Sequence, residues 1–77
     1  MVEVKVYTTS SCPWCNVVKE FLMEHNVEFE EINVGANHAA AMKMVRKSGS
    51  MGVPQVEIGG RMIVGFDEDA IREALGI

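Results

Sequence analysis

The sequence lacks the features that a large or membrane-bound protein requires. Its 77 residues allow one compact domain, spanning 1–77, and leave no room for a second core or a separate cofactor-binding lobe. No apolar run approaches the roughly 20 residues of a membrane-spanning helix, and the first residues lack the basic stretch and apolar segment of a secretion signal. We therefore expect a cytoplasmic protein with no membrane partner.

Positive charge is scarce as well. Seven Lys and Arg residues stand against eleven Asp and Glu residues, which gives a formal net charge of −4. A surface that neutralises nucleic-acid phosphates or anionic lipids has the opposite balance, so we expect no nucleic-acid partner. Apolar residues make up 48% of the chain and charged residues 23%, a composition typical of a folded, soluble domain.

The chain has only two cysteines, Cys12 and Cys15, and they lie two residues apart. A disulfide across so short a loop would restrain the unfolded chain little, and in a reducing compartment such a pair is more typical of chemistry than of scaffolding. Cys-x2-Cys is also half of a zinc site. Only His25 and His38 could complete one, and neither has zinc-finger spacing, so we expect no metal. His25 falls on the apolar side of a predicted helix and is expected to be a packing residue.

Hydrophobic periodicity predicts the secondary structure. Period-two alternation predicts strands, and apolar residues three and four positions apart predict helices. Hydroxyls of residues 9–11 are expected to cap the first helix and Asp67 the last, with a hairpin turn at Gly59 and Gly60. The order β-α-β-α-β-β-α predicts an α/β domain with a four-stranded mixed sheet flanked by helices. The predicted strands cover residues 2–8, 27–34, 54–58 and 61–64, and the helices 12–26, 35–48 and 67–75.

The two cysteines lie where a strand passes into a helix. Unpaired N–H groups and the helix dipole at that position favour the thiolate form of Cys12. The thiolate is the attacking species in disulfide exchange, and a second thiol one helical turn onward can displace a bound partner. Cys12 is therefore the predicted exposed nucleophile and Cys15 the more buried resolving cysteine.

Three segments together resemble the glutaredoxin family and the glutaredoxin-like redoxins: residues 7–15 (YTTSSCPWC), 52–56 (GVPQV) and 65–67 (GFD). The resemblance covers nearly the whole chain and implies a thioredoxin fold. It also implies that Pro54 is a cis proline beside the sulfurs and that the Val53 backbone pairs with an extended substrate or glutathione. By itself, the sequence favours a trans Pro54, because X-Pro bonds are mostly trans.

The resemblance further implies a glutathione-binding surface around the cysteines. The backbone of Phe66 and Asp67 and the Asp67 carboxylate, at a helix start, would hold the γ-glutamyl end of glutathione. From the residues alone, Asp67 is equally explained as a plain helix N-cap. The residues implied to contact substrate or glutathione are Thr9, Pro13, Trp14, Val53, Pro54, Gly65, Phe66 and Asp67.

The chain departs from the family pattern at three positions. Thr9 stands where glutathione-dependent members usually have a lysine or arginine, Gly52 replaces the usual threonine, and residues 64–65 are Val-Gly in place of Gly-Gly. The missing cation would attract a glycyl carboxylate and help to stabilise the thiolate. The candidates for replacing it are basic residues of the second predicted helix, namely Lys43, Arg46 and Lys47.

The activity implied is that of a monomeric dithiol oxidoreductase that reduces protein disulfides or glutathionylated thiols through Cys12 and Cys15. It would need no tightly bound cofactor and would use glutathione as co-substrate. Two alternatives stay open. One is a redoxin recycled by thioredoxin reductase, and the other is a non-enzymatic carrier of a metal or of an iron–sulfur cluster shared between two copies. The sequence does not choose the electron donor.

Overall fold

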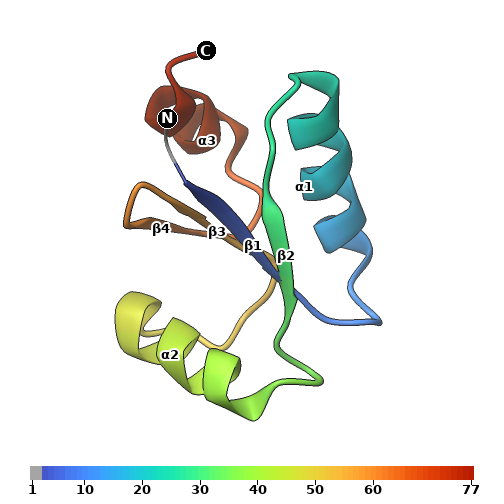
Figure 1. Ribbon diagram of the computed structural model, residues 1–77, viewed down its shortest axis with the longest axis vertical. Helices are drawn as coiled ribbons and strands as arrows, with labels where there is room; N and C mark the ends of the chain where they lie inside the picture. Colours follow the sequence, from blue (N-terminus) through green and yellow to red (C-terminus); the bar gives the residue numbers. More distant parts are fainter. Residues whose placement is uncertain (1–2) are drawn as a thin grey trace.

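The computed structural model describes residues 3–77 (Figure 1). The elements follow the predicted order, and the predicted four-stranded mixed sheet with flanking helices is confirmed. The elements are β1 (Val4–Thr8), α1 (Pro13–Glu24), β2 (Glu30–Asn33), α2 (His38–Ser48), β3 (Gln55–Ile58), β4 (Arg61–Val64) and α3 (Glu68–Leu75).

The sheet has the strand order β2-β1-β3-β4. Strands β1 and β2 are parallel, whereas β1 with β3 and β3 with β4 are antiparallel. Figure 1 shows α1 and α3 on one side of the sheet and α2 on the other. Every residue of the inner strand β3 is buried, while the edge strand β2 exposes Glu30 and Glu31. Helix α1 begins just beyond the carboxyl end of β1, and this places the two cysteines at that end of the sheet.

The core lies mainly between the sheet and the α1–α3 pair. Helix α1 buries the predicted apolar stripe, including Val18, Phe21 and Leu22. Helix α3 buries Ile71 completely, and its other predicted apolar residues pack around the same cluster while partly exposed. The apolar faces predicted from helical spacing are therefore the faces that hold the helices to the sheet.

The second strand is shorter than predicted. The chain leaves α1 through Asn26, which has a positive φ of 56°, and the backbone N–H of Val27 then donates to the carbonyl of Leu22 (2.9 Å). This bond closes the end of the helix and keeps Val27 out of the ladder. Residues 27–29 are therefore a loop, although Val27 and Phe29 still pack against the core. Their apolar alternation comes from packing and does not reflect strand pairing.

Helix α2 also begins later than predicted. Its first residue is His38 and not Gly35, because the side-chain oxygen of Asn37 accepts a hydrogen bond from the backbone N–H three residues on (3.0 Å). Asn is among the residues preferred at the N-cap, the position just before the first residue of a helix, and it therefore marks where a helix begins. The first strand begins at Val4, and the predicted strand residue Val2 lies outside the described residues.

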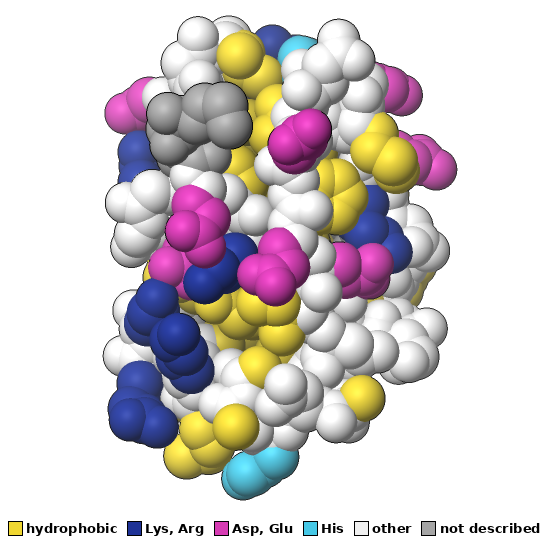
Figure 2. Space-filling view, in the orientation of Figure 1, with side chains coloured by type: hydrophobic (Ala, Val, Ile, Leu, Met, Phe, Trp, Pro, Cys, Tyr) yellow, Lys and Arg dark blue, Asp and Glu magenta, His cyan; other side chains and the backbone are white. Residues whose placement is uncertain are grey.

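A buried polar cluster ties α2 to the sheet. Glu57 of β3 is largely buried and accepts hydrogen bonds from the Tyr7 hydroxyl (2.7 Å) and the Lys47 ammonium group (2.8 Å). The hydrogen bond from Lys47 holds the pKa of Glu57 below its ordinary value, whereas burial, together with the bond to Glu57, raises the pKa of Tyr7. Figure 2 shows basic side chains gathered over the end of the molecule that α2 forms, with acidic side chains beside them.

A Lys47→Met variant is expected to lose about 1–2 kcal/mol of unfolding free energy at neutral pH, because it leaves a buried carboxylate without its cation. Partial exposure of Lys47 keeps the loss below that of a fully buried pair. Because the pKa of Glu57 is lower in the folded state than its ordinary 4.5, the pair stabilises above that pH and loses its effect as pH falls through the folded value.

The measurement is urea unfolding of both proteins at about pH 7 and about pH 3, where the difference should shrink. Lys43→Met is the matched control, since Lys43 is exposed on the same helix and its loss changes the net charge equally. It should shift stability by less than about 0.5 kcal/mol. A Lys47→Met loss that is equal at both pH values would contradict the charge-based account.

Candidate active site

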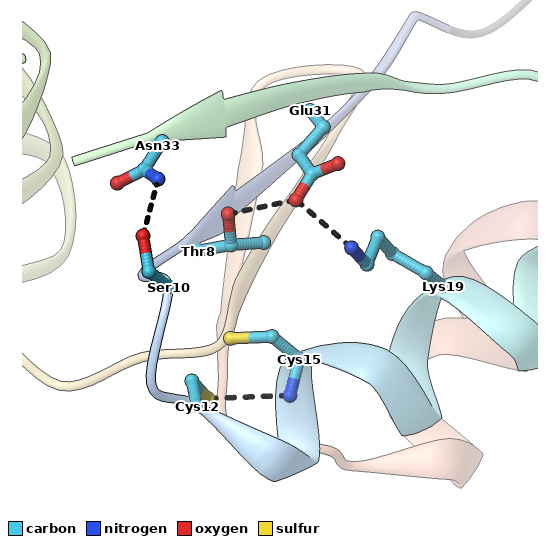
Figure 3. A network of polar contacts seen from close by, with 7 residues as sticks. All are labelled: Thr8, Ser10, Cys12, Cys15, Lys19, Glu31 and Asn33. Carbon is cyan, nitrogen blue, oxygen red and sulfur yellow. Dashed lines mark hydrogen bonds and ion pairs between the residues drawn. The ribbon is translucent and has the colours of Figure 1, made fainter. Parts of the chain in front are cut away.

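The two cysteines differ sharply in exposure, as predicted. Cys15 is buried, with 1% of its surface exposed, while Cys12 is partly exposed. Cys12 is itself the N-cap of α1: its Sγ accepts a hydrogen bond from the backbone N–H of Cys15 at 3.2 Å (Figure 3). The prediction that hydroxyls of residues 9–11 cap this helix is therefore wrong. Pro13 occupies the first turn, where its missing N–H costs no hydrogen bond.

The helix start sets the electrostatics of the two sulfurs differently. The Cys12 sulfur lies at the positive end of the α1 dipole, accepts an N–H, and has no acidic residue in the first helical turn beside it. These features make the start of α1 a site suited to an anion. Burial raises the pKa of Cys15 to about 11, so that thiol is protonated near neutrality. The arrangement is therefore suited to an exchange reaction in which one cysteine attacks and the other stays a protonated thiol until the resolving step.

The loop before β3 contains the cis peptide bond between Val53 and Pro54. Pro54 is buried and Val53 is partly exposed. The side-chain amide of Gln55 donates to the carbonyls of Ser50 (2.9 Å) and Gly52 (2.8 Å), and these two hydrogen bonds anchor the loop to the start of β3. The cis state implied by the resemblance is thus present in the structure. The anchoring role of Gln55 was not predicted, because a polar residue inside a strand pattern gives no sign of what it holds.

The segment before α3 is joined to both of these regions. The N–H of Gly65 donates to the carbonyl of Pro54 (2.7 Å), with Gly65 at a positive φ of 80°. The ring of Phe66 stacks on Trp14 with centroids 6.4 Å apart and meets Phe21 edge-on at 5.7 Å. Residues 65–66 therefore connect the cysteine helix with the cis-proline loop, two regions that are far apart in the sequence.

The remaining predicted residues lie next to these regions along the chain. The Thr9 carbonyl accepts a hydrogen bond from the N–H of Cys12 (3.4 Å), so Thr9 adjoins the nucleophile. Asp67 is exposed and caps α3, with Oδ1 accepting the N–H of Ala70 (3.2 Å), as its alternative assignment predicted. Trp14 is 59% exposed. The glutathione contacts assigned to these residues stay predictions.

Comparisons with known proteins agree with this geometry. Residues 4–63 match the sequence profile of the Glutaredoxin family. Glutaredoxin 3 of Escherichia coli K12 is 34% identical over 76 residues, 99% of this chain and 92% of that protein. A glutaredoxin-like 8.6 kDa protein in the rubredoxin operon of Clostridium pasteurianum is 38% identical over 68 residues, 88% of this chain and 91% of that one.

The chain belongs to the glutaredoxin family. A crystal structure of glutaredoxin from Archaeoglobus fulgidus superposes with a TM-score of 0.86 at 32% identity, covering 97% of this chain and 87% of that one. The thioredoxin fold is therefore confirmed. Membership in the glutaredoxin family brings thiol-disulfide oxidoreductase activity with it.

The cations considered as replacements for the missing basic residue near the glutaredoxin nucleophile are not equivalent. All three side chains are exposed, but Lys47 is held by Glu57 in the cluster that ties α2 to the sheet, whereas neither Lys43 nor Arg46 forms an ion pair among the described residues. All three lie on α2, which is across the sheet from the cysteine helix (Figure 1). Lys47 is thus already committed to a structural role.

Sequence reasoning missed a polar cluster beside Cys15, formed by Thr8, Lys19 and Glu31. One oxygen of Glu31, Oε2, accepts both the Thr8 hydroxyl and the Lys19 ammonium group, each at 3.0 Å (Figure 3). In the sequence, Glu31 only interrupts the alternation of a strand. The opposite charge at Lys19 was a usable signal, because the parallel pairing of β1 and β2 beside α1 brings the two together.

Two structural features are absent from residues 3–77. In this part of the chain, no three His, Cys, Asp or Glu side chains gather as a metal ion would require. No helix there has the length and apolar character needed to cross a bilayer. The predicted packing role of His25 is confirmed, since its ring lies 4.4 Å from that of Phe21 and its Nδ1 lies 2.9 Å from the Phe21 carbonyl oxygen.

Proposed function

We propose that this glutaredoxin acts by a dithiol mechanism. The Cys12 thiolate attacks a disulfide and forms a mixed disulfide with one half of it, and Cys15 then displaces that half, leaving a Cys12–Cys15 disulfide. The observation that carries the proposal is the contrast between the two sulfurs. One is accessible at a helix N-terminus, and the other is buried one turn later with a raised pKa.

The proposed substrates are protein disulfides and glutathionylated proteins, and glutathione is the proposed reductant. An extended chain would pair with the Val53 backbone, and Trp14 with Phe66 would form the apolar wall beside the sulfur. The carboxylate at the γ-glutamyl end of glutathione would meet the N-terminus of α3, at the backbone of residues 66–67. The hydrogen bond from Gly65 to Pro54 places this backbone beside the cis-proline loop. We further propose that the protein works as a monomer in the cytoplasm.

A Cys15→Ser variant tests the dithiol part of this proposal. It is expected to lose reduction of protein disulfides by at least about 100-fold, because no thiol remains to displace the bound protein. It should keep a measurable rate with a glutathionylated peptide, since a second glutathione can resolve that intermediate. Both activities are measured by coupled turnover. Full activity of the variant on protein disulfides would contradict a resolving role for Cys15.

The same assay identifies the electron donor. We expect the wild-type protein to turn over with glutathione, glutathione reductase and NADPH. With thioredoxin reductase and NADPH in place of the glutathione system, the rate should be at least about tenfold lower, since the proposed contacts at Val53, Trp14 and Phe66 hold a glutathionyl group in the productive orientation. The opposite ranking would overturn glutathione as reductant while leaving the chemistry of the two cysteines intact.

A further inference from the structure

The buried thiol of Cys15 shares its side of α1 with a charged group. Lys19 follows Cys15 by four residues, so both side chains lie on the same face of the helix. Glu31 draws the Lys19 ammonium group toward the sheet at 3.0 Å and also accepts the hydroxyl of Thr8, a residue that is almost fully buried. Figure 3 shows this cluster on the side of α1 that faces β1.

The second step of exchange needs negative charge on Cys15. Burial, together with the neighbouring Cys12 sulfur, raises the pKa of that thiol to about 11, so few Cys15 thiolates exist near neutral pH. Two groups act in the opposite direction and lower the pKa, namely a backbone hydrogen bond at Thr9 and, with a smaller effect, the charge of the Lys19 ammonium group. Glu31 of β2 faces Lys19, and Thr8 of β1 contributes only a neutral hydroxyl.

We propose that Lys19 promotes the resolving step by stabilising the charge that develops on Cys15, and that its hydrogen bond to the side-chain oxygen of residue 31 holds Lys19 in place. The inference rests on the proposed resolving role of Cys15. Lys19 does not touch the reacting sulfurs and acts through its charge alone. This assigns a catalytic purpose to an ion pair that would otherwise be read as a surface link between α1 and β2.

The step itself is a two-electron exchange. The Cys15 thiol gives its proton to water, and the thiolate attacks the Cys12 sulfur of the mixed disulfide. The Cys12–Cys15 bond forms as the bond between Cys12 and the partner sulfur breaks, and the partner leaves as a thiolate. The two cysteines are oxidised and the partner disulfide is fully reduced. The ammonium group of Lys19 enters and leaves this step unchanged.

Single turnover with a symmetrical aromatic disulfide whose released thiolate is coloured separates the two steps. Attack by Cys12 releases the first equivalent of thiolate, and displacement by Cys15 releases the second. In Lys19→Met we expect the second phase to slow about three- to tenfold at neutral pH, with its pH–rate curve moved to higher pH and the first phase unchanged. Lys19→Arg keeps the charge and should stay within about twofold of wild type.

Glu31→Gln gives the decisive comparison. The glutamine oxygen can still accept from Lys19 and Thr8, but the negative charge that offsets Lys19 is gone. The second phase should therefore be as fast as wild type or faster, with its pH–rate curve moved to lower pH. A merely structural ion pair predicts the reverse, because both Lys19→Met and Glu31→Gln remove it and would slow the reaction together.

The outcomes separate the inference from the function on which it rests. If Cys15→Ser abolishes the second phase while Lys19→Met leaves it unchanged, the dithiol mechanism stands and the role of Lys19 is overturned. Equal slowing in Lys19→Met and Glu31→Gln, or slowing in Lys19→Arg, also overturns it. If Cys15→Ser still releases the second equivalent at the wild-type rate, the proposed function fails first.

Discussion

A Cys12→Ser variant is expected to lose disulfide exchange almost completely, with turnover reduced by a factor of about 1000 or more. The serine hydroxyl stays protonated at neutral pH and is a poor nucleophile toward sulfur, and the buried Cys15 cannot replace it from inside the helix. The measurement is coupled turnover on a glutathionylated peptide, with Cys15→Ser as the comparison, because that variant should keep activity on the same substrate.

The stability of this variant separates chemistry from folding. The Cys12 sulfur caps α1 by accepting the Cys15 N–H, and serine is among the preferred residues at a helix N-cap. Cys12→Ser should therefore unfold at the same urea concentration as wild type, or at a higher one. Lost activity in a fully folded variant is the expected combination. Retention of more than about 1% of the turnover would show that another group is the nucleophile.

A Leu22→Ala variant is expected to lose about 2–5 kcal/mol of unfolding free energy. Leu22 is completely buried on the face of α1 that packs against β1, and truncation leaves a cavity between the helix and the sheet. A loss of this size is a large fraction of the total for so small a domain. The midpoint of thermal unfolding should fall by more than about 8 °C.

Met23→Ala is the matched control for Leu22→Ala. It removes a side chain of similar size from the next position of the same helix, where 58% of the surface of Met23 is exposed. The change in stability should stay within about 0.5 kcal/mol. Equal losses from the two variants, measured by urea and thermal unfolding, would contradict the placement of the α1 face that packs on the sheet.

The order and type of the elements were predictable because each carries a strong local signal. Helix faces follow from apolar spacing, as at Leu22 and Ile71, and the hairpin from its paired glycines. The boundaries were less predictable because they depend on single hydrogen bonds. The bond from Val27 to Leu22 shortens the second strand, and the cap at Asn37 delays the second helix. Such bonds compete with propensity in ways that a pattern does not show.

The site was predictable where function depends on spacing along the chain. The exposure of Cys12 and the burial of Cys15 follow from their positions at a helix start. Contacts between distant segments, such as the stacking of Trp14 on Phe66, were not predictable from the residues. The cis bond before Pro54 followed only from the resemblance to the glutaredoxin family. Glu31 was read as a break in a strand, because its partner Lys19 becomes a neighbour only after the sheet forms.

The acidic edge strand has a consequence for the protein in concentrated solution. The outer side of β2 carries backbone N–H and carbonyl groups that could pair with a strand from another molecule, which is the usual start of sheet-to-sheet aggregation. Two copies meeting edge to edge there would bring the exposed carboxylates of Glu30 close together, and beside them those of Glu31, whose charge Lys19 offsets in part. Like-charge repulsion thus opposes pairing of this sheet edge with another molecule, without a helix or loop to cover the edge.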